Sequence, residues 1–245
     1  MNQRLDKKIR ELAKDNTYSK LKNYFNGEKC IVFGCGPSLN DYEPSLLIEK
    51  FHDHYFLCIK QSFYRFKDRC NIHFINDNNM VRYEYLENQV VISSGGSHIF
   101  PFKNLLSKNP IYHYTIRNSG YANTVARTND FSINEFGENF LVNWGPGIML
   151  EVVVPFLVHS GFSDVKFLGW DYTDHNQRHW DHYYDSSHVD LFYNPSHGAM
   201  VEYNESIDLV NNTEYLYEYL RENNITAQIL SEKSFVSDKF NRIKL

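Results

Sequence analysis

The sequence predicts an α/β fold in which helices cover both faces of a mostly parallel sheet. Short apolar segments rich in β-branched and aromatic residues alternate with helix-length or irregular connections, the pattern of buried parallel strands joined by crossovers. These segments end in small, amide or polar residues, and ligands bind beyond the carboxyl ends of the strands in such sheets. At 245 residues and 42% hydrophobic content, the chain is long enough for one domain with a full core.

The expected elements follow in chain order. Residues 1–26 place apolar side chains on one helical face, so they predict one or two helices that Gly27 ends. We therefore divide the chain into an N-terminal helical extension, residues 1–28, and one domain, residues 29–245. The expected strands are Cys30–Phe33, Tyr55–Ile59, Ile72–Asn76, Gln89–Ser93, Ile111–Ile116, Val165–Leu168 and Ala227–Leu230. The clear helices are Ile148–His159, ended by Gly161, and Ser206–Glu222.

The first strand leads into a glycine-rich turn, Gly34-Cys35-Gly36-Pro37-Ser38. The two glycines permit a tight turn and a close backbone approach, and Pro37 suits the first position of a helix. A strand, a glycine turn and a helix start direct several backbone N–H groups to one point, so we interpret Gly34–Ser38 as a phosphate-binding turn. The turn lacks the Lys-Ser/Thr pair of the Walker loop and the third glycine of the dinucleotide fingerprint. A strand-to-helix turn that binds nothing is the alternative.

Other strand ends supply further candidates for the same site. Polar residues follow the second, third and sixth strands, and a second glycine-rich turn precedes the most apolar helix. The N-terminus of that helix could face the same ligand, although an ordinary loop explains the turn as well. In addition to Gly34–Ser38, the candidate ligand-binding residues are Lys60, Gln61, Asn76, Gly145, Gly147, Asp171 and Tyr172.

The segment from about residue 173 to 200 is expected to be a lid. The stretch from Gly169 to Tyr203 holds five of the 11 histidines, few aliphatic residues and no clear period, and such long polar-aromatic loops are usually functional. Histidines at this density can ligate a metal or move protons, but no H-E-x-x-H or paired C-x-x-C pattern is present. His197, in Asn-Pro-Ser-His-Gly before the last helix, is a candidate general base for an acceptor hydroxyl.

Bulk properties exclude several classes of protein. The formal net charge of -5 argues against a general nucleic-acid-binding protein. The four cysteines show no C-x-x-C spacing, so we expect reduced thiols in a cytoplasmic protein. The N-terminus lacks the apolar run of a signal peptide, and the most apolar segment is too short to span a bilayer. Because residues 1–26 are basic and amphipathic, peripheral contact with the inner face of the membrane stays open.

Three blocks of the sequence resemble the bacterial family 42 sialyltransferases, and more loosely the flagellin-glycosylation proteins that share the Gly-x-Gly-Pro-Ser-Leu opening. The first block is Ile31–Leu39, in which Cys35 stands where those sialyltransferases typically have Asn. The second is Gly147–Tyr172, a glycine-started helix, a strand and Gly-Trp-Asp-Tyr. The third is Ser196-His197-Gly198 with the closing helix and strand.

This resemblance implies a single-domain α/β/α sandwich with a Rossmann-like sheet, a variant of the GT-A type, and a lid. It implies transfer of a nonulosonic sugar, such as sialic acid, from a CMP-sugar donor to a glycan acceptor, with inversion and without a metal or other cofactor. His197 matches the family's general base, and His188, also preceded by Ser, is its rival. Tyrosines bind the leaving phosphate in that family, and the matching candidates here are Tyr172 and either Tyr183 or Tyr184.

Three other functions remain open, one of them a metal hydrolase that uses the histidines and aspartates of the segment after Gly169. A nucleotide pyrophosphokinase-like enzyme would need Mg²⁺ held by carboxylates such as Asp77 or Asp171. A non-catalytic module would hold the nucleotide as a ligand only. The sequence does not determine the acceptor, and homo-oligomerisation is also left open.

Overall fold

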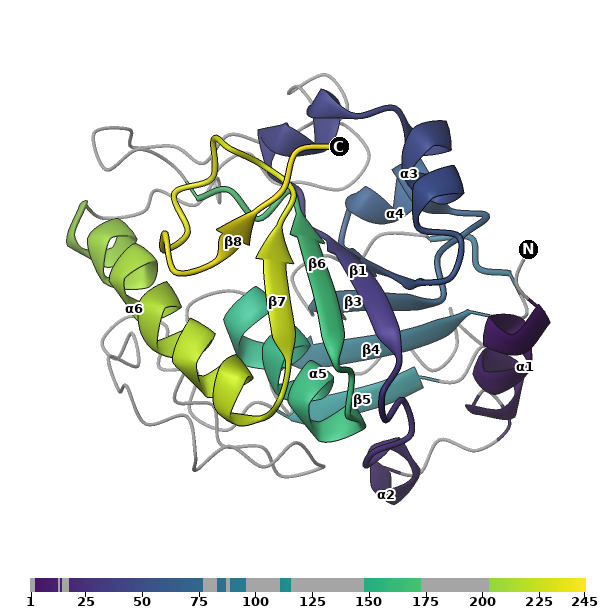
Figure 1. Cartoon of the computed structure of the whole chain (residues 1–245). Coiled ribbons are helices and arrows are strands. Elements are labelled where there is room, and N and C mark those ends of the chain that lie inside the picture. The colour runs from purple at the N-terminus through teal and green to yellow at the C-terminus, as the bar shows by residue number, and fades with distance from the viewer. Residues whose placement is uncertain are drawn as a thin grey trace.

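The computed structural model describes residues 3–12, 14, 18–76, 83–86, 89–95, 111–115, 148–172 and 203–245. They form one eight-stranded sheet in the order β5-β4-β3-β2-β1-β6-β7-β8, and every neighbouring pair is parallel (Figure 1). The strands are β1 (Lys29–Phe33), β2 (Tyr55–Ile59), β3 (Ile72–Asn76), β4 (Val90–Gly95), β5 (Ile111–Thr115), β6 (Asp164–Leu168), β7 (Thr226–Ile229) and β8 (Asn241–Arg242). All seven expected strands and the α/β fold class are confirmed.

The helices are mostly short. They are α1 (Gln3–Leu12), α2 (Tyr18–Leu21), η1 (Pro37–Asp41), α3 (Pro44–Lys50), α4 (Ser62–Phe66), η3 (Met149–Val153), α5 (Val154–Ser160) and α6 (Tyr203–Glu222). The expected helix at 148–159 is confirmed as one π-helical turn, η3, that runs directly into α5. Gly161 ends it in the left-handed conformation, φ 82°, and donates its N–H to the carbonyls of Leu157 and Val158.

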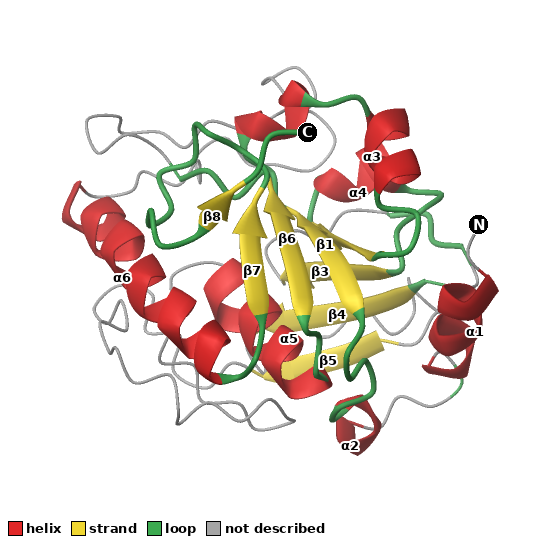
Figure 2. Ribbon diagram, viewed as in Figure 1, coloured by secondary structure: helices red, strands yellow, loops and turns green. Residues whose placement is uncertain are grey.

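Helices cover both faces of the sheet. Successive strand residues point to opposite sides, so alternate residues pack against different helices. In β1, Cys30 and Val32 pack in one hydrophobic cluster with residues of α1, α2, α5 and α6. Ile31 and Phe33 pack in the other cluster with residues of η1, α3 and α4. Figure 2 shows the strands turning progressively from β7 to β5, the usual twist of a parallel sheet. Both faces are therefore buried, as the uninterrupted apolar strands predict.

The N-terminal helices are part of this core. Leu5, Ile9 and Leu12 of α1 are at most 1% exposed and belong to the cluster that packs against β1 and β2. Arg4 and Lys8 on its other face pair with the buried carboxylate of Glu28, just before β1. The apolar face of α1 is thus occupied by the protein itself and is not available to a lipid surface. Within the described residues, no helix has the length and apolar character needed to cross a membrane.

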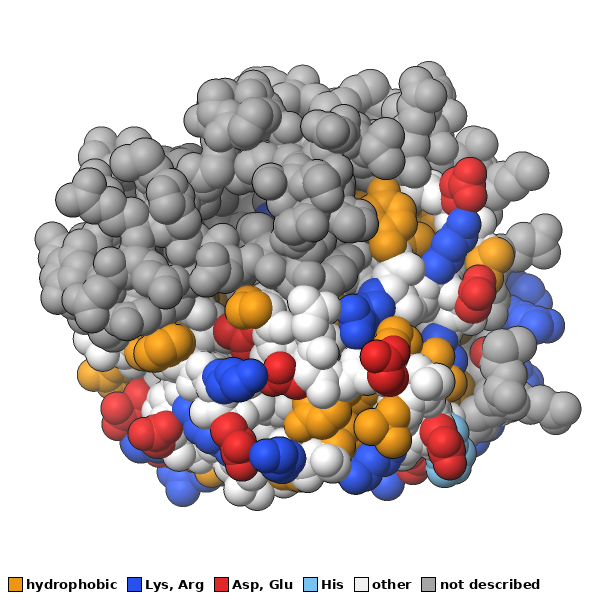
Figure 3. Space-filling model, turned by 90° about the horizontal axis from the view of Figure 1, so that it is seen from above, with side chains coloured by type: hydrophobic (Ala, Val, Ile, Leu, Met, Phe, Trp, Pro, Cys, Tyr) orange, Lys and Arg blue, Asp and Glu red, His pale blue; other side chains and the backbone are white. Residues whose placement is uncertain are grey.

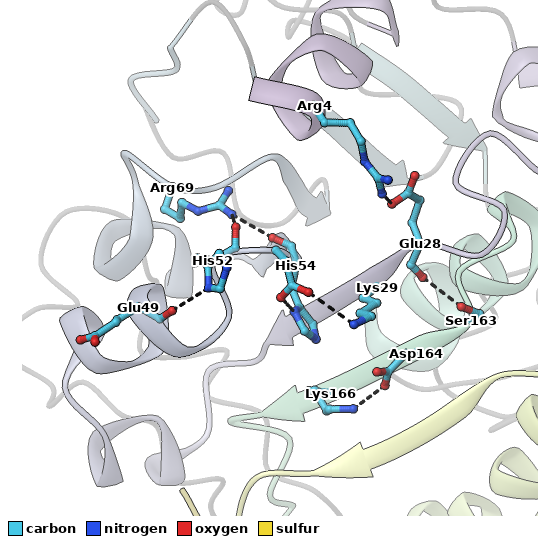
Figure 4. Close-up of polar contacts among 11 residues, drawn as sticks. Arg4, Glu28, Lys29, Glu49, His52, His54, Arg69, Ser163, Asp164 and Lys166 are labelled. Carbon is cyan, nitrogen blue, oxygen red and sulfur yellow. Dashed lines mark hydrogen bonds and ion pairs between the residues drawn. The ribbon is translucent and has the colours of Figure 1, made fainter. Parts of the chain in front are cut away.

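Ion pairs and buried hydrogen bonds hold the amino edge of the sheet together (Figure 4). Asp53 accepts hydrogen bonds from Lys29, at 3.3 Å, and from Nδ1 of His54, at 2.7 Å. The guanidinium of Arg69 donates to the backbone carbonyls of His52 and His54, at 3.2 and 2.9 Å. These contacts join β1 and the loop before β3 to the loop before β2, which is a structural role for this edge.

Candidate functional site

The direction of the chain through the sheet reverses at β1. Strands β1 to β5 follow one another toward one edge, and β6 then pairs with the other side of β1. After β1 the chain runs to η1 and α3 on one face, whereas after β6 it leads to α6 on the other face. In open α/β sheets such a switch point opens a crevice at the carboxyl ends of the two strands, where ligands bind. The Gly34–Ser38 turn and the Gly169–Tyr172 turn lie side by side at this switch point.

The two turns pack backbone against backbone. The N–H of Gly34 donates to the carbonyl of Leu168, and the N–H of Gly36 donates to that of Gly169, each at 2.8 Å. A Cβ atom at Gly34 would lie 2.2 Å from the carbonyl oxygen of Gly169, and one at Gly169 would lie 2.7 Å from that of Gly34. Gly169 also has a φ of 75°. These glycines therefore permit the two turns of the chain to approach each other closely.

Gly34→Ala is expected to destabilise the fold by about 2–3 kcal/mol, because the added methyl group overlaps a backbone carbonyl that cannot move away. Gly34 does not have a positive φ, so alanine carries no conformational strain of its own there. The free energy of unfolding in urea measures the effect. Gly27→Ala is the comparison for backbone strain alone, since its φ is 75° and no atom lies within 4 Å of its Cβ position, and it should cost only about 1 kcal/mol. Unchanged or increased stability of Gly34→Ala would show that the packing argument is wrong.

The backbone N–H groups of the first turn are largely used within the protein. The turn has four such groups, because Pro37 has none, and three of them donate internally: those of Gly34, Gly36 and Ser38. The Ser38 N–H, at the start of η1, donates to Oδ2 of Asp171 at 2.7 Å. A carboxylate of the protein thus already occupies the helix start. That Gly34–Ser38 contact the phosphate or another part of a ligand stays a prediction.

Asp171 is a buried acidic residue where the two turns meet. Its side chain is buried, and burial raises the pKa of its carboxyl group, while hydrogen bonds from Ser38 oppose that rise. Its second oxygen, Oδ1, is buried and has no hydrogen-bond partner among the described residues. Two unit negative charges about 4 Å apart repel by about 4 kcal/mol at an effective dielectric constant near 20. A phosphate is therefore expected to bind away from Asp171.

Side-chain hydrogen bonds from Cys35 and Ser62 link the carboxyl ends of β1 and β2. The Sγ of Cys35 donates to the carbonyl of Ile59 at 3.2 Å, and burial raises the pKa of this thiol to about 11. Cys35 therefore keeps its proton near neutral pH and is not a thiolate nucleophile. Ser62, fully buried at the start of α4, donates to the carbonyl of Phe33 at 2.7 Å and accepts the N–H of Ile59 at 2.9 Å.

A buried histidine that sequence reasoning missed supports the end of β2. His73, the second residue of β3, is fully buried, with Nε2 at 2.8 Å from the carbonyl oxygen of Lys60 and Nδ1 at 2.8 Å from the hydroxyl of Tyr85. A carbonyl only accepts, so Nε2 carries the proton and Nδ1 accepts from the tyrosine. Burial lowers the pKa of His73 to about 3. The neutral ring thus holds Lys60, whose φ is 49°, in its left-handed conformation.

The turn after β6 is held from the opposite side by the loop that follows β7. Ser234 Oγ donates to the carbonyl of Trp170, and the Phe235 N–H donates to that of Asp171, both at 2.7 Å. Tyr172 has a φ of 52°, packs against the core cluster, and has its pKa raised to about 12 by burial. Its hydroxyl is therefore protonated at neutral pH and able to donate a hydrogen bond.

The structure brings part of the predicted site together. Gly34–Ser38, Lys60, Gln61, Asp171 and Tyr172 lie at the carboxyl ends of β1, β2 and β6, and Asn76 ends β3 at the same edge. Six predicted site residues lie outside the described residues: Gly145, Gly147, Tyr183, Tyr184, His188 and His197. The expected lid, at about 173–200, lies outside them as well.

The surface near this edge is mixed in charge. Figure 3 views the molecule from above, the side toward which β6 and β7 point in Figure 1, and acidic and basic side chains are interspersed over the described part of this face. Hydrophobic side chains form small separate groups between them. Within the part of the chain that the structure describes, no group of three or more His, Cys, Asp or Glu side chains is arranged to hold a metal ion.

Comparisons with known proteins give a likeness in fold. No protein-family model matches the sequence, so the resemblance to family 42 sialyltransferases has no support of that kind, and no curated protein matches it either. Among solved structures, the chain is similar to the MAf glycosyltransferase from Magnetospirillum magneticum AMB-1, with a TM-score of 0.51 and 10% identity. The match covers 98% of this chain and 37% of that chain, so this chain spans little more than a third of its length. At this identity the likeness supports the α/β fold alone.

Proposed function

We propose that this chain is a glycosyltransferase that takes a sugar from a nucleotide-sugar donor bound at the carboxyl ends of β1, β2 and β6. The observation that carries the proposal is the pairing of the Gly34–Ser38 and Gly169–Tyr172 turns at the switch point of the sheet. The similarity in fold to a protein named a glycosyltransferase supports it. The sequence blocks around the same two turns, which resemble a family of sugar transferases, support it independently.

The finer proposal is a CMP-sugar donor, a nonulosonic sugar such as sialic acid, and a glycan acceptor. The acceptor oxygen attacks the anomeric carbon and passes its proton to His197, while the bond from that carbon to the phosphate oxygen breaks and its electron pair leaves with CMP. The reaction inverts the anomeric centre and needs no metal. Hydroxyl groups of Tyr172 and of Tyr183 or Tyr184 donate to the departing phosphate. His188 is the alternative base.

Nucleotide binding is the first test. We expect CMP to raise the midpoint of thermal unfolding, with or without Mg²⁺, above the shifts given by CDP, UDP, GDP and ATP. A ligand at 100 times its Kd stabilises the folded state by about 2.7 kcal/mol, and each kcal/mol raises the midpoint by about 2–4 °C in a domain of this size. No shift with any of the five nucleotides would contradict the proposal.

The same assay separates the alternatives. A shift with ATP that requires Mg²⁺ would indicate a pyrophosphokinase-like enzyme instead. Incubating the protein with a CMP-sugar and water then distinguishes a catalyst from a binding module, because a transferase slowly hydrolyses its donor when no acceptor is present. Hydrolysis that is unchanged by EDTA agrees with the metal-independent mechanism.

A further inference from the structure

We propose that Asp171 binds a ribose hydroxyl of the nucleotide and makes this site selective for ribonucleotides over deoxyribonucleotides. The inference rests on the proposed function, since it assigns the nucleoside half of the donor to the carboxyl ends of β1 and β6, beside the two glycine turns. The amino-acid sequence suggested a phosphate at this position. The contacts of Asp171 favour a neutral hydrogen-bond donor instead.

One oxygen of the carboxylate is used and the other is not. Oδ2 accepts the N–H of Ser38 at 2.7 Å, whereas Oδ1 is buried without a hydrogen-bond partner among the described residues. Buried carboxylate oxygens are nearly always paired, because an unpaired one has lost its water without replacement. A ligand that supplies one O–H or N–H at Oδ1 would restore the missing hydrogen bond.

The carboxylate is held in position before any ligand arrives. Its backbone carbonyl accepts the N–H of Phe235 at 2.7 Å, and its side chain is tied to η1 through Ser38. A Cβ atom at Gly36 would lie 2.4 Å from Oδ2, so the second glycine of the turn leaves the space that this carboxylate fills. A group fixed from two segments loses little conformational entropy on binding, which favours a role in recognition.

The chemistry of a nucleotide then selects the ribose. The phosphate is an anion and is repelled by the carboxylate. The ribose carries neutral O–H donors next to the phosphate, and an acidic side chain at the switch point of an α/β sheet is suited to accept from them. The exocyclic amine of cytosine is the other hydrogen-bond donor in CMP. UMP, which lacks this amine, tests that alternative below.

The test compares ligands on the unaltered protein first. We expect isothermal titration calorimetry to give an affinity for CMP about 10–100-fold above that for 2′-deoxy-CMP or 3′-deoxy-CMP, the range for one hydrogen bond to a charged group. Asp171→Asn should weaken CMP binding and bring CMP and the deoxynucleotide within about twofold of each other, because a charged acceptor has been lost. The comparison of ligands on the unaltered protein does not depend on how the variant folds.

Asp41→Asn is the matched control. Asp41 ends η1, pairs with Lys233 at 3.2 Å, and also acts on the Asp171 carboxyl electrostatically, so the variant removes the same charge from the same rim. It should keep the preference for CMP.

Equal binding of CMP and both deoxynucleotides by the unaltered protein, or a preference that persists in Asp171→Asn, would overturn the inference and leave the proposed function standing. A preference that follows the cytosine amine, seen as loss of binding with UMP alone, would overturn it too. If no nucleotide binds, the proposed function fails and the inference fails with it.

Discussion

His197→Ala is expected to slow sugar transfer by about 10²–10⁴-fold while CMP binds as tightly as before. This is the usual contribution of a general base, and it is lost because no other group then accepts the proton of the attacking hydroxyl. The nucleotide contacts the turns after β1 and β6 in the proposal, so removing the imidazole leaves donor binding intact. Turnover with a CMP-sugar and a glycan acceptor gives the rate, and calorimetry with CMP gives the affinity.

Two further variants decide which histidine is the base. His188→Ala is measured in parallel, and the larger loss of kcat identifies the residue that takes the proton. His52→Ala is the control, because His52 is exposed in the loop before β2 at the opposite edge of the sheet. A His197→Ala protein that turns over at the unaltered rate, with His188→Ala impaired, would transfer the role to His188. Two fully active variants would remove the general base from the proposed mechanism.

The strands could be predicted because their signal is local. Segments such as Tyr55–Ile59 are apolar on both sides. The residues of the segment alone therefore predict a buried parallel strand, and they place its ends to within two residues. The helices α3 and α4, of seven and five residues, are too short to show a helical period, and the sequence did not predict them. What the sequence shows is the strand framework; the short connections are determined by packing.

The contacts that shape the candidate site have no local signal. The sequence marks Gly34 and Gly169 as turn residues. It does not show that each must be glycine because the backbone of the other lies against it, which follows from the pairing of β1 with β6. The sequence also places Asp171 near the first turn without indicating that its carboxylate takes the Ser38 N–H. The phosphate-binding interpretation of this turn therefore stays a prediction, because the sequence pattern does not reveal which N–H groups are already bonded within the protein.

His73 is the clearest case of a residue that only the tertiary structure explains, and it carries the last prediction. Because its pKa falls from about 6.5 to about 3 on folding, the unfolded chain binds the proton first as the pH drops. Its contribution to stability is therefore complete above about pH 6.5 and is lost down to about pH 3. The free energy of unfolding should fall by about 1.4 kcal/mol per pH unit in this window, roughly 4–5 kcal/mol in all. That is comparable with the whole stability of many domains.

His73→Gln isolates this term, since the variant keeps an N–H donor for Lys60 and cannot take up a proton. We expect it to lose about 1–3 kcal/mol at pH 7.5, from imperfect hydrogen bonds to Lys60 and Tyr85, and to lose much less than the unaltered protein between pH 6.5 and pH 4. Urea unfolding at several pH values measures both. His54 has a pKa lowered by burial as well, but it is present in both proteins, so its effect cancels in the difference. If the free energy of unfolding fell in parallel with pH for the two proteins, His73 would be protonated as readily in the folded protein as in the unfolded chain. A neutral imidazole would then not be what holds the Lys60 turn.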